Sequence, residues 1–397
     1  MRGFTEKQKN YFNEAVHRWN VKSGATRSGK TYMDYFVIPL RIKAVRGKDG
    51  LIVLLGNTKG TLQRNIIEPL QNVWGINYVG DIKSDNTAHM FGEKVYCLGA
   101  DKINQVDKLR GSSIKYCYGD EIVTWNEEVF NMLKSRLDKE YSKFDGTCNP
   151  DTPNHWFKKF IDTAEEKEID LYYQKYTLDD NTFLPEEVKE NIKREYFGTV
   201  FYERYVLGNW VRAEGLVYPF FDEKKHCFKT LPEMFYTYYV SIDYGTQNPC
   251  AMHLWAVNEH LRIAYVLKEY YYDGREERKQ KTDAEYYNDL FDFCKEKQIE
   301  SVIVDPSAAS FKTEIMKHRY LHCRNANNDV LDGIRFTASC MQSGKIFINK
   351  DCKKTIEEFK TYSWDDKSGE DKVIKENDHA MDSIRYMAYT VLRRLGF

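Results

Sequence analysis

The chain has 397 residues, which is too long for one ordinary domain and predicts two or three. Lysine and arginine total 59 against 60 acidic residues, so the overall charge gives no sign of nucleic-acid binding, although acidic metal sites can balance a basic DNA-facing surface. The lack of a long apolar run or signal-peptide core favours a soluble protein with no membrane partner, and nine cysteines without a Cys-x-x-Cys pair favour a reducing cytoplasm over a disulfide framework or a zinc site.

A glycine-rich segment early in the chain fits the phosphate-binding loop of nucleotide hydrolases. It consists of Gly24, Ala25, Thr26, Arg27, Ser28, Gly29, Lys30 and Thr31. In such a loop the glycines let backbone N–H groups approach the phosphates, the lysine neutralises the β and γ oxygens, and the hydroxyl residue binds Mg²⁺. The segment therefore predicts binding of ATP and Mg²⁺. A plain turn that enters a helix is the alternative.

Between residues 50 and 150, short apolar runs alternate with helix-like stretches. The runs are LIVLLGN, KVYCLGA and IKYCYGDE, and a helix is expected over residues 62–73. This alternation predicts a mostly parallel sheet flanked by helices. The last run ends in Asp120 and Glu121, so that Asp120 could hold Mg²⁺ and Glu121 could orient or deprotonate the attacking water. A solvated turn is the alternative for this acidic pair.

Hydrolysis of ATP also requires positive charge on the transferring phosphoryl group, normally from an arginine. Arg27 inside the loop and Arg110 ahead of the acidic run are the two candidates, and either could be an ordinary surface residue. Gln8 could bind adenine through its amide, although an isolated glutamine is more often a surface residue.

The domain boundary is expected near Arg212, where glycines and aromatic residues follow a charged, helix-prone stretch. This division gives an ATPase domain over residues 1–212, with a possible lid or linker at 151–208, and a second domain over 213–397. In the second domain, three strand-like runs predict an antiparallel meander. They are followed by a helix over residues 282–297, a strand at 301–308 and a last helix at 379–394.

Acidic residues recur at the ends of the elements expected in the second domain. Asp243 lies in the first strand, Asp305 ends the fourth, and Asp378, His379 and Asp382 precede or open the last helix. Residues three or four apart share one face of a helix. Carboxylates are the ligands of hard cations, and two such ions can activate water and stabilise the departing oxygen of a phosphodiester. Taken singly, each aspartate could instead be a turn or cap residue.

Together these residues resemble one family, the large subunit of phage terminase. The resemblance rests on GATRSGKT, LRGSSIKYCYGDE, GTCNPDTPNHWF and NDHAMDSIRY, in that order along the chain from Gln8 to Tyr386. It implies that Thr147 and Asn149 sense the γ-phosphate and that Gln8 contacts adenine, whereas an ordinary Asn-Pro turn is the alternative for the third motif. It also implies that Asp243, Asp305 and Asp382 bind metal with His379 beside them, and it leaves the role of Asp378 open.

This resemblance predicts a P-loop ATPase domain with a mostly parallel sheet, followed by a ribonuclease H-like α/β nuclease domain. It implies that the protein moves duplex DNA into a procapsid and cuts concatemeric DNA with two Mg²⁺ or Mn²⁺ ions, in the cytoplasm of an infected bacterium. The expected partners are the terminase small subunit, the portal protein and further copies in a ring. The alternatives are a helicase-nuclease of repair or recombination, which would need a second ATP-fold domain, and a nucleotide-dependent DNA-binding protein without nuclease activity.

Overall fold

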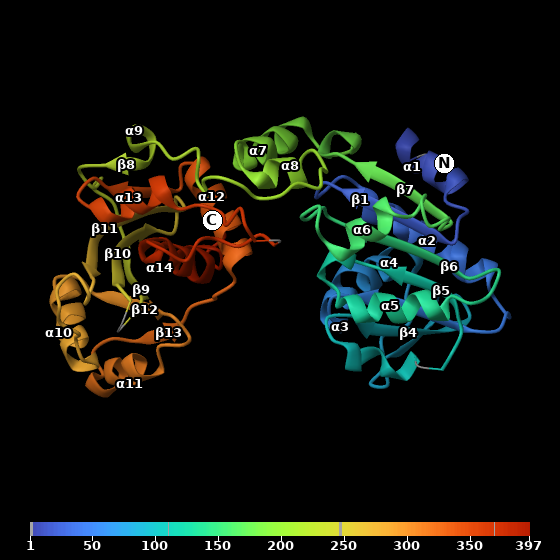
Figure 1. Cartoon of the computed structure of the whole chain (residues 1–397), viewed down its shortest axis with the longest axis horizontal. Coiled ribbons are helices and arrows are strands. Elements are labelled where there is room, and N and C mark those ends of the chain that lie inside the picture. The colour runs from blue at the N-terminus through green and yellow to red at the C-terminus, as the bar shows by residue number, and fades with distance from the viewer. Residues whose placement is uncertain (1–2, 110, 246–247, 369) are drawn as a thin grey trace. The chain divides into compact units, whose positions relative to one another are not determined.

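The chain folds into two compact α/β units. The computed structural model describes residues 3–109, 111–245, 248–368 and 370–397. The first unit comprises residues up to Glu190 and Tyr202–Arg212, and the second comprises Asn191–Phe201 and Ala213–Phe397 (Figure 1). This division differs from the predicted 1–212 domain in residues 191–201, which group with the second unit.

The described residues of the first unit form a seven-stranded sheet in the order β3-β4-β2-β5-β6-β1-β7. All neighbouring strands are parallel except β3, which runs antiparallel to β4 at the edge. The strands are β1 (Trp19–Gly24), β2 (Leu51–Gly56), β3 (Thr87–Met90), β4 (Glu93–Gly99), β5 (Ile114–Gly119), β6 (Lys143–Cys148) and β7 (Leu171–Tyr176). The predicted parallel sheet is therefore present, and its strands end at the edge where the glycine-rich loop begins.

The helices of the first unit cover both faces of this sheet. They are α1 (Glu6–Glu14), α2 (Lys30–Ala44), α3 (Lys59–Leu62), the π-helix η1 (Gln63–Ile67), α4 (Glu68–Trp74), η2 (Ile103–Leu109), η3 (Ile122–Thr124), α5 (Glu127–Arg136), α6 (Trp156–Asp162), η4 (Leu178–Asp180) and, across the unit boundary, α7 (Glu186–Tyr196) and α8 (Val200–Tyr205). Successive residues of β2 point to opposite faces of the sheet and belong to different hydrophobic cores. Ile52 and Leu54 pack with α2 to α4, whereas Val53 and Leu55 pack with α5 and α6. Burial on both faces explains why β2 is apolar at every position.

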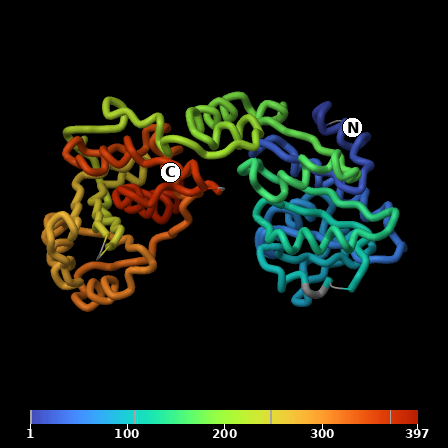
Figure 2. The backbone as a smooth tube through the Cα atoms, viewed as in Figure 1, coloured from blue at the N-terminus to red at the C-terminus, as the bar shows by residue number. Residues whose placement is uncertain are grey.

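The segment predicted as a lid or linker, residues 151–208, contributes to both units. Its strand β7 pairs with β1 and so belongs to the first sheet. Residues 191–201 pack on the second unit instead, where the Ser339 hydroxyl donates to Glu195 over 3.5 Å. The path of the chain through this segment can be followed in green in Figure 2.

The second unit contains a mixed seven-stranded sheet within its described residues, in the order β13-β12-β9-β10-β11-β14-β8. The strands are β8 (Cys227–Phe228), β9 (Thr237–Asp243), β10 (Cys250–Asn258), β11 (Ile263–Tyr272), β12 (Ile299–Val304), β13 (Cys323–Asn325) and β14 (Ile346–Asn349). Strands β9, β10 and β11 form the predicted antiparallel meander, and β12 lies parallel to β9. The carboxyl ends of β9 and β12 therefore meet at one edge of the sheet.

Helices cover both faces of the second sheet as well. They are α9 (Glu223–His226), α10 (Asp283–Cys294), α11 (Ala309–His318), α12 (Val330–Gln342), α13 (Lys353–Thr361), α14 (His379–Met387) and the π-helix η5 (Ala388–Leu392). Helices α10 and α11 share an apolar core with one face of β9 and β12. On the other face, a buried polar network joins His253 of β10 to Ser383 of α14 (2.8 Å) and to Thr355 of α13 (2.7 Å). In the described ranges, no helix is long and apolar enough to cross a membrane.

Candidate active sites

The glycine-rich loop connects the end of β1 to the start of α2. A Cβ atom at Gly24 would lie 2.0 Å from the carbonyl oxygen of Tyr176 in β7, so only glycine fits there. Gly29 has a φ of 85°, a left-handed conformation that glycine adopts without strain. It leads directly into α2, whose free N–H groups point toward the loop and favour a bound anion.

Lys30 lies at the first position of α2 with its ammonium folded back over the loop. The Nζ atom donates to the carbonyl oxygens of Gly24 (3.2 Å) and Ala25 (2.9 Å) and to the side-chain oxygen of Asn149 (2.7 Å). Burial lowers the pKa of Lys30 to about 8, although nearby acidic groups favour its charged form. A predicted phosphate-binding residue and a predicted γ-phosphate sensor thus contact each other directly.

Asp120 follows β5 and is held by two neutral donors. Its carboxylate accepts hydrogen bonds from the Thr147 hydroxyl (3.1 Å) and from the amide of Asn65 (3.2 Å). Burial raises the pKa of Asp120, whereas these two hydrogen bonds and the charge of Lys30 act against that rise. Asn65 was not predicted, because no sequence motif links a helix residue to a strand that follows it fifty positions later.

Lys30, Asp120, Thr147 and Asn149 all line one cavity of about 280 Å³. The remaining predicted residues on its wall are Thr31 and Glu121, and Glu121 has a left-handed φ of 52°. Residues that the sequence patterns did not single out complete the lining: Tyr35, Arg64, Asn65, Pro69 and Cys148. Asp120, Thr31 and Lys30 bring a carboxylate, a hydroxyl and an ammonium group to this cavity, and these groups suit Mg²⁺ and phosphate oxygens.

The other predicted residues of this site lie around the loop. Gln8 is almost fully buried, and its amide donates to the Gly29 carbonyl (2.9 Å) while its oxygen caps the first turn of α1. Arg27 is exposed with a left-handed φ of 55°, and its carbonyl oxygen accepts from Asn181 (2.7 Å). Thr26 donates to the Tyr205 carbonyl over 3.5 Å, and Ser28 is buried. Arg110 lies outside the described residues.

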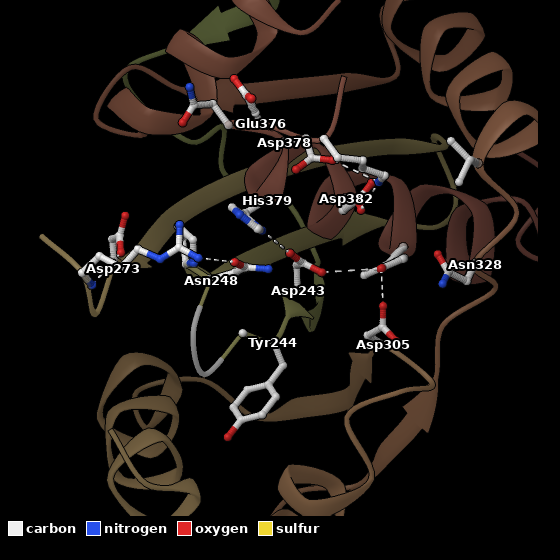
Figure 3. Close-up of a pocket in the computed structure, with 17 residues that line it drawn as sticks. Asp243, Tyr244, Asn248, Asp273, Asp305, Asn328, Glu376, Asp378, His379 and Asp382 are labelled. Atoms are coloured by element: carbon white, nitrogen blue, oxygen red, sulfur yellow. Dashed lines mark hydrogen bonds and ion pairs between the residues drawn. The ribbon is translucent and has the colours of Figure 1, made fainter. Parts of the chain in front are cut away.

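The second candidate site is a cavity of about 600 Å³ in the second unit, shown in Figure 3. Every acidic residue predicted for this domain lines it. Asp243 ends β9, Asp305 directly follows β12, and Asp378, His379 and Asp382 lie at the start of α14. Three segments far apart in the sequence therefore bring four carboxylates and an imidazole to one hollow.

Asp243 is the centre of a hydrogen-bonded group in this cavity. Its carboxylate contacts the His379 ring over 2.8 Å (Figure 3). The Tyr386 hydroxyl donates to Asp305 over 2.5 Å and lies 3.5 Å from the Asp243 carboxylate. Burial raises the pKa of Asp243. Burial acts to lower the pKa of His379, but the hydrogen bond and charge of Asp243 outweigh it and the pKa is raised. Tyr386 was not predicted as a site residue, since its place on α14 was assigned only to helical packing.

Asp378 and Asp382 are paired with cations. Lys375 lies 3.0 Å from Asp378 and 3.2 Å from Asp382, while Arg385 donates to the other oxygen of Asp382 (2.9 Å). In the part of the chain that the structure describes, no three acidic, histidine or cysteine side chains form a group that could hold a metal ion as they stand. A set of carboxylate donors nevertheless suits Mg²⁺ or Mn²⁺. A bound ion would replace Lys375 and Tyr386 as the partner of some of these carboxylate oxygens.

The helix that carries His379 and Asp382 begins at an unusual cap. Asp378 is its N-cap residue but makes no side-chain cap hydrogen bond. Instead Glu358 of α13, which is 3% exposed, accepts from the backbone N–H groups of Ala380 (2.7 Å) and Met381 (3.1 Å). Burial raises the pKa of Glu358 to about 7. A carboxylate twenty residues away in sequence thus fixes the first turn of the helix that lines the cavity.

Comparison with known proteins finds similarity along the whole chain. The family described as terminase large subunit, T4likevirus-type, N-terminal, matches residues 22–225. The terminase large subunit of Escherichia phage T5 is 23% identical over 407 residues, covering 97% of this chain and 89% of that protein. The solved structure of the large terminase from the thermophilic bacteriophage D6E is 37% identical with a TM-score of 0.89, covering 98% of this chain and 100% of that one. Structures of the D6E protein in complex with ADP and with ATP-γ-S superpose with TM-scores of 0.85.

Proposed function

Because the chain belongs to the terminase large subunit family, we propose that it is a DNA-packaging motor whose first unit hydrolyses ATP and whose second unit cuts DNA. The observation that supports this proposal best is the presence of two separate cavities with complementary chemistry. The first is lined by Lys30 and Thr31 of the glycine-rich segment and by Asp120. The second gathers Asp243, Asp305 and Asp382 in a different unit.

In the first unit, each lining residue has a role that its contacts support. The loop N–H groups and Lys30 bind the β and γ phosphates, and Lys30 exchanges its carbonyl and Asn149 partners for phosphate oxygens. Thr31 and Asp120 would hold Mg²⁺, which offsets the phosphate charge when bound. Glu121 orients the attacking water and accepts its proton. Thr147 in β6 and Asn149 just after it would report the phosphate state through Asp120 and Lys30, and Gln8 would contact the adenine.

In the second unit, Asp243, Asp305 and Asp382 would hold one or two Mg²⁺ or Mn²⁺ ions. Such ions lower the pKa of bound water and stabilise the oxygen that leaves a phosphodiester. The Tyr386 hydroxyl donates to Asp305 and lies 3.5 Å from Asp243, so it helps to position the two carboxylates. His379 orients Asp243 and can take up or release a proton at the edge of the cavity. Asp378 pairs with Lys375, whose charge would attract a DNA phosphate to this cavity.

The partners follow from the family to which the chain belongs. We infer that it acts on duplex DNA in the cytoplasm of an infected bacterium, together with a terminase small subunit and a portal protein. We also infer a ring of copies during packaging, in which either Arg27 or Arg110 completes an ATP site. A helicase-nuclease is not favoured, since the sheet of the second unit mixes parallel and antiparallel strands and bears no second phosphate-binding loop among its described residues.

The test is a double comparison of ATP hydrolysis and plasmid cleavage by the full chain. Wild type, Lys30→Ala and Asp305→Ala proteins would be assayed for phosphate release with Mg²⁺ and for nicking of supercoiled plasmid with Mn²⁺. We expect Lys30→Ala to lose hydrolysis but keep cleavage, and Asp305→Ala to do the reverse. A wild-type protein that cleaves no DNA with either metal would leave an ATPase without the nuclease function. Loss of both activities in each variant would contradict two separate sites.

A further inference from the structure

The ATP cavity contains a cation that the sequence patterns did not indicate. Hydrolysis needs positive charge at the γ-phosphoryl group in addition to the loop lysine. Of the two arginines expected to supply it, Arg27 is exposed and is not among the described residues that line the cavity, and Arg110 lies outside the described residues. Arg64 does line the cavity, together with Lys30, Asp120 and Glu121.

Arg64 lies on the short π-helix η1, between α3 and α4. Such single π-turns inside α-helices are frequent at functional sites, because the extra residue turns a side chain out of the regular helical register. The next residue in the same turn, Asn65, donates to Asp120 over 3.2 Å. Two consecutive residues of η1 therefore line the cavity. The hydrogen bond of Asn65 holds this turn close to Asp120, which directly follows β5.

The position of Arg64 favours the γ-phosphate over the other phosphates. The α and β phosphates are expected within the N–H groups of residues 24–29, on the loop side of Lys30. None of the described residues 24–29 lines this cavity. Arg64 lines it instead, together with Asp120, Glu121 and Thr147, where the γ-phosphoryl group and the attacking water are expected. Its side chain is exposed, and the ion pairs between described residues do not engage it, so its charge is available to a phosphate.

From this placement we propose that Arg64 binds the γ-phosphoryl group of ATP within the same subunit and stabilises its charge during hydrolysis. The inference rests on the proposed ATPase function of this cavity. A guanidinium presents paired donors that match phosphate oxygens, which a lysine at the same position cannot reproduce. The π-turn would then link γ-phosphate contact at Arg64 to the Asp120 carboxylate through Asn65.

The experiment compares two nucleotides that differ at the γ-phosphate. Affinities of the full chain for ATP-γ-S and for ADP would be measured by calorimetry for wild type, Arg64→Ala, Arg64→Lys and Arg46→Ala. Arg46 is an exposed arginine of the same unit that does not line this cavity, and it serves as the charge-matched control. For Arg64→Ala we expect roughly tenfold weaker ATP-γ-S binding, ADP binding within about twofold of wild type, and kcat lower by about 100-fold. Arg64→Lys should recover only part of the loss.

Three outcomes would overturn the inference, and they differ from one another. Equal weakening of ADP and ATP-γ-S binding would mean that Arg64 only supports the loop. Unchanged affinity and kcat would mean that it is a surface residue. Failure of the wild-type protein to bind ATP-γ-S would remove the proposed ATPase function itself, and the inference with it.

Discussion

The ammonium of Lys30 has three oxygen partners before any phosphate arrives. They are the carbonyls of Gly24 and Ala25 and the side chain of Asn149, and burial lowers the pKa of Lys30 to about 8. Nucleotide binding replaces some of these neutral oxygens with charged ones, which favour the protonated lysine far more strongly. The charge state of this single residue should therefore set how the affinity for ATP depends on pH.

We predict that ATP affinity falls as the pH rises above about 8. Lys30 must be protonated to bind phosphate, and in the free protein it loses its proton above its lowered pKa, so affinity should decline by up to about tenfold per pH unit. Phosphate groups themselves lose their last proton near pH 6, below this range. Nucleotide titrations from pH 6.5 to 9.5 measure the slope, and Lys30→Arg, which does not titrate there, should show none. A flat wild-type curve would contradict this role for Lys30.

The Thr147 hydroxyl gives a second prediction at the scale of single atoms. Thr147→Val keeps the shape of the side chain but removes the donor to Asp120 that now lies 3.1 Å away. Loss of a hydrogen bond to a charged group costs about 1.5–3 kcal/mol, so kcat should fall roughly 10- to 100-fold with little change in ADP affinity. Thr147→Ser retains the hydroxyl and should stay near wild type. Steady-state phosphate release measures both variants, and normal turnover by Thr147→Val would count against the contact.

The residues that sequence patterns predicted share one property, which is that a local motif or a strand end marks them. Lys30 and Thr31 belong to a motif of fixed spacing. Asp120, Asp243 and Asp305 end apolar runs, and the last two of these runs point to one sheet edge. Arg64, Tyr386 and Glu358 carry no such mark. Each comes close to its site only because separate helices and strands pack together in the fold. The spacing of residues along the sequence does not predict such packing.

Two helices of the second unit begin at carboxylates supplied by other elements. Glu269 of β11 accepts from the backbone N–H groups of Lys354 (2.9 Å) and Thr355 (2.8 Å) at the start of α13, and Glu358 of α13 does the same for α14. Neither helix has a side-chain cap from its own N-cap residue. A carboxylate at a helix N-terminus satisfies free N–H groups and interacts favourably with the helix dipole. The two contacts connect β11 to α13 and then to the helix of His379 and Asp382.

We predict that Glu358→Ala destabilises the second unit and weakens its metal site. Two buried N–H groups would lose their acceptor, at a cost of roughly 2–4 kcal/mol, and the first turn of α14 would lose its fixed position. Glu358→Gln should be tolerated, because it keeps an oxygen acceptor and resembles the neutral carboxyl that a pKa of about 7 makes accessible. Chemical unfolding and Mn²⁺ titration of the full chain measure the two effects. The exposed neighbour Glu357→Ala is the control, and equal behaviour of the two alanine variants would refute the capping role.

The elements themselves were predictable to different degrees. The meander β9 to β11 was predicted because each strand is long and separated by turn residues, and the predicted helix at 62–73 corresponds to a continuous helical stretch over α3, η1 and α4. No sequence pattern predicted the π-turn inside that stretch. Strand β7 was missed because its sequence, LYYQKY, lies in a charged region and is only partly buried at the sheet edge. The two- and three-residue strands β8 and β13 exist only through pairing with distant neighbours.

At the scale of the whole molecule, the second unit is discontinuous in sequence. Residues 191–201 belong to it, residues 202–212 belong to the first unit, and the second unit then resumes at Ala213. In the short upstream segment Phe201 is only 4% exposed, and Glu195 accepts a hydrogen bond from Ser339 of α12. Composition alone placed the boundary at residue 212 and did not predict that residues 191–201 belong to the second unit. The reason is that α7 and α8 lie in one charged, helix-prone region of the sequence.

We predict that a fragment of residues 191–397 is more stable than one of residues 213–397. The longer fragment retains the burial of Phe201, worth about 2 kcal/mol, which corresponds to roughly 5 °C in Tm for a domain of this size. Thermal unfolding of both fragments, with plasmid nicking as the check on the active site, measures the difference. A third fragment that starts at residue 202 controls for added length. If all three melt together, residues 191–201 do not stabilise the second unit.

Because the second unit is discontinuous in sequence, recombination between two related proteins cannot exchange it with a single breakpoint. A recombination event at residues 212 and 213 would join the body of one parent's second unit to residues 191–201 from the other parent. A breakpoint before residue 191 keeps the second unit whole but brings foreign residues 202–212 into the first unit. There the Val206 carbonyl accepts a hydrogen bond from Leu178, which follows the edge strand β7. With either breakpoint, one of the two units contains residues from both parents. The two halves are therefore expected to be inherited, and to diverge, as a pair.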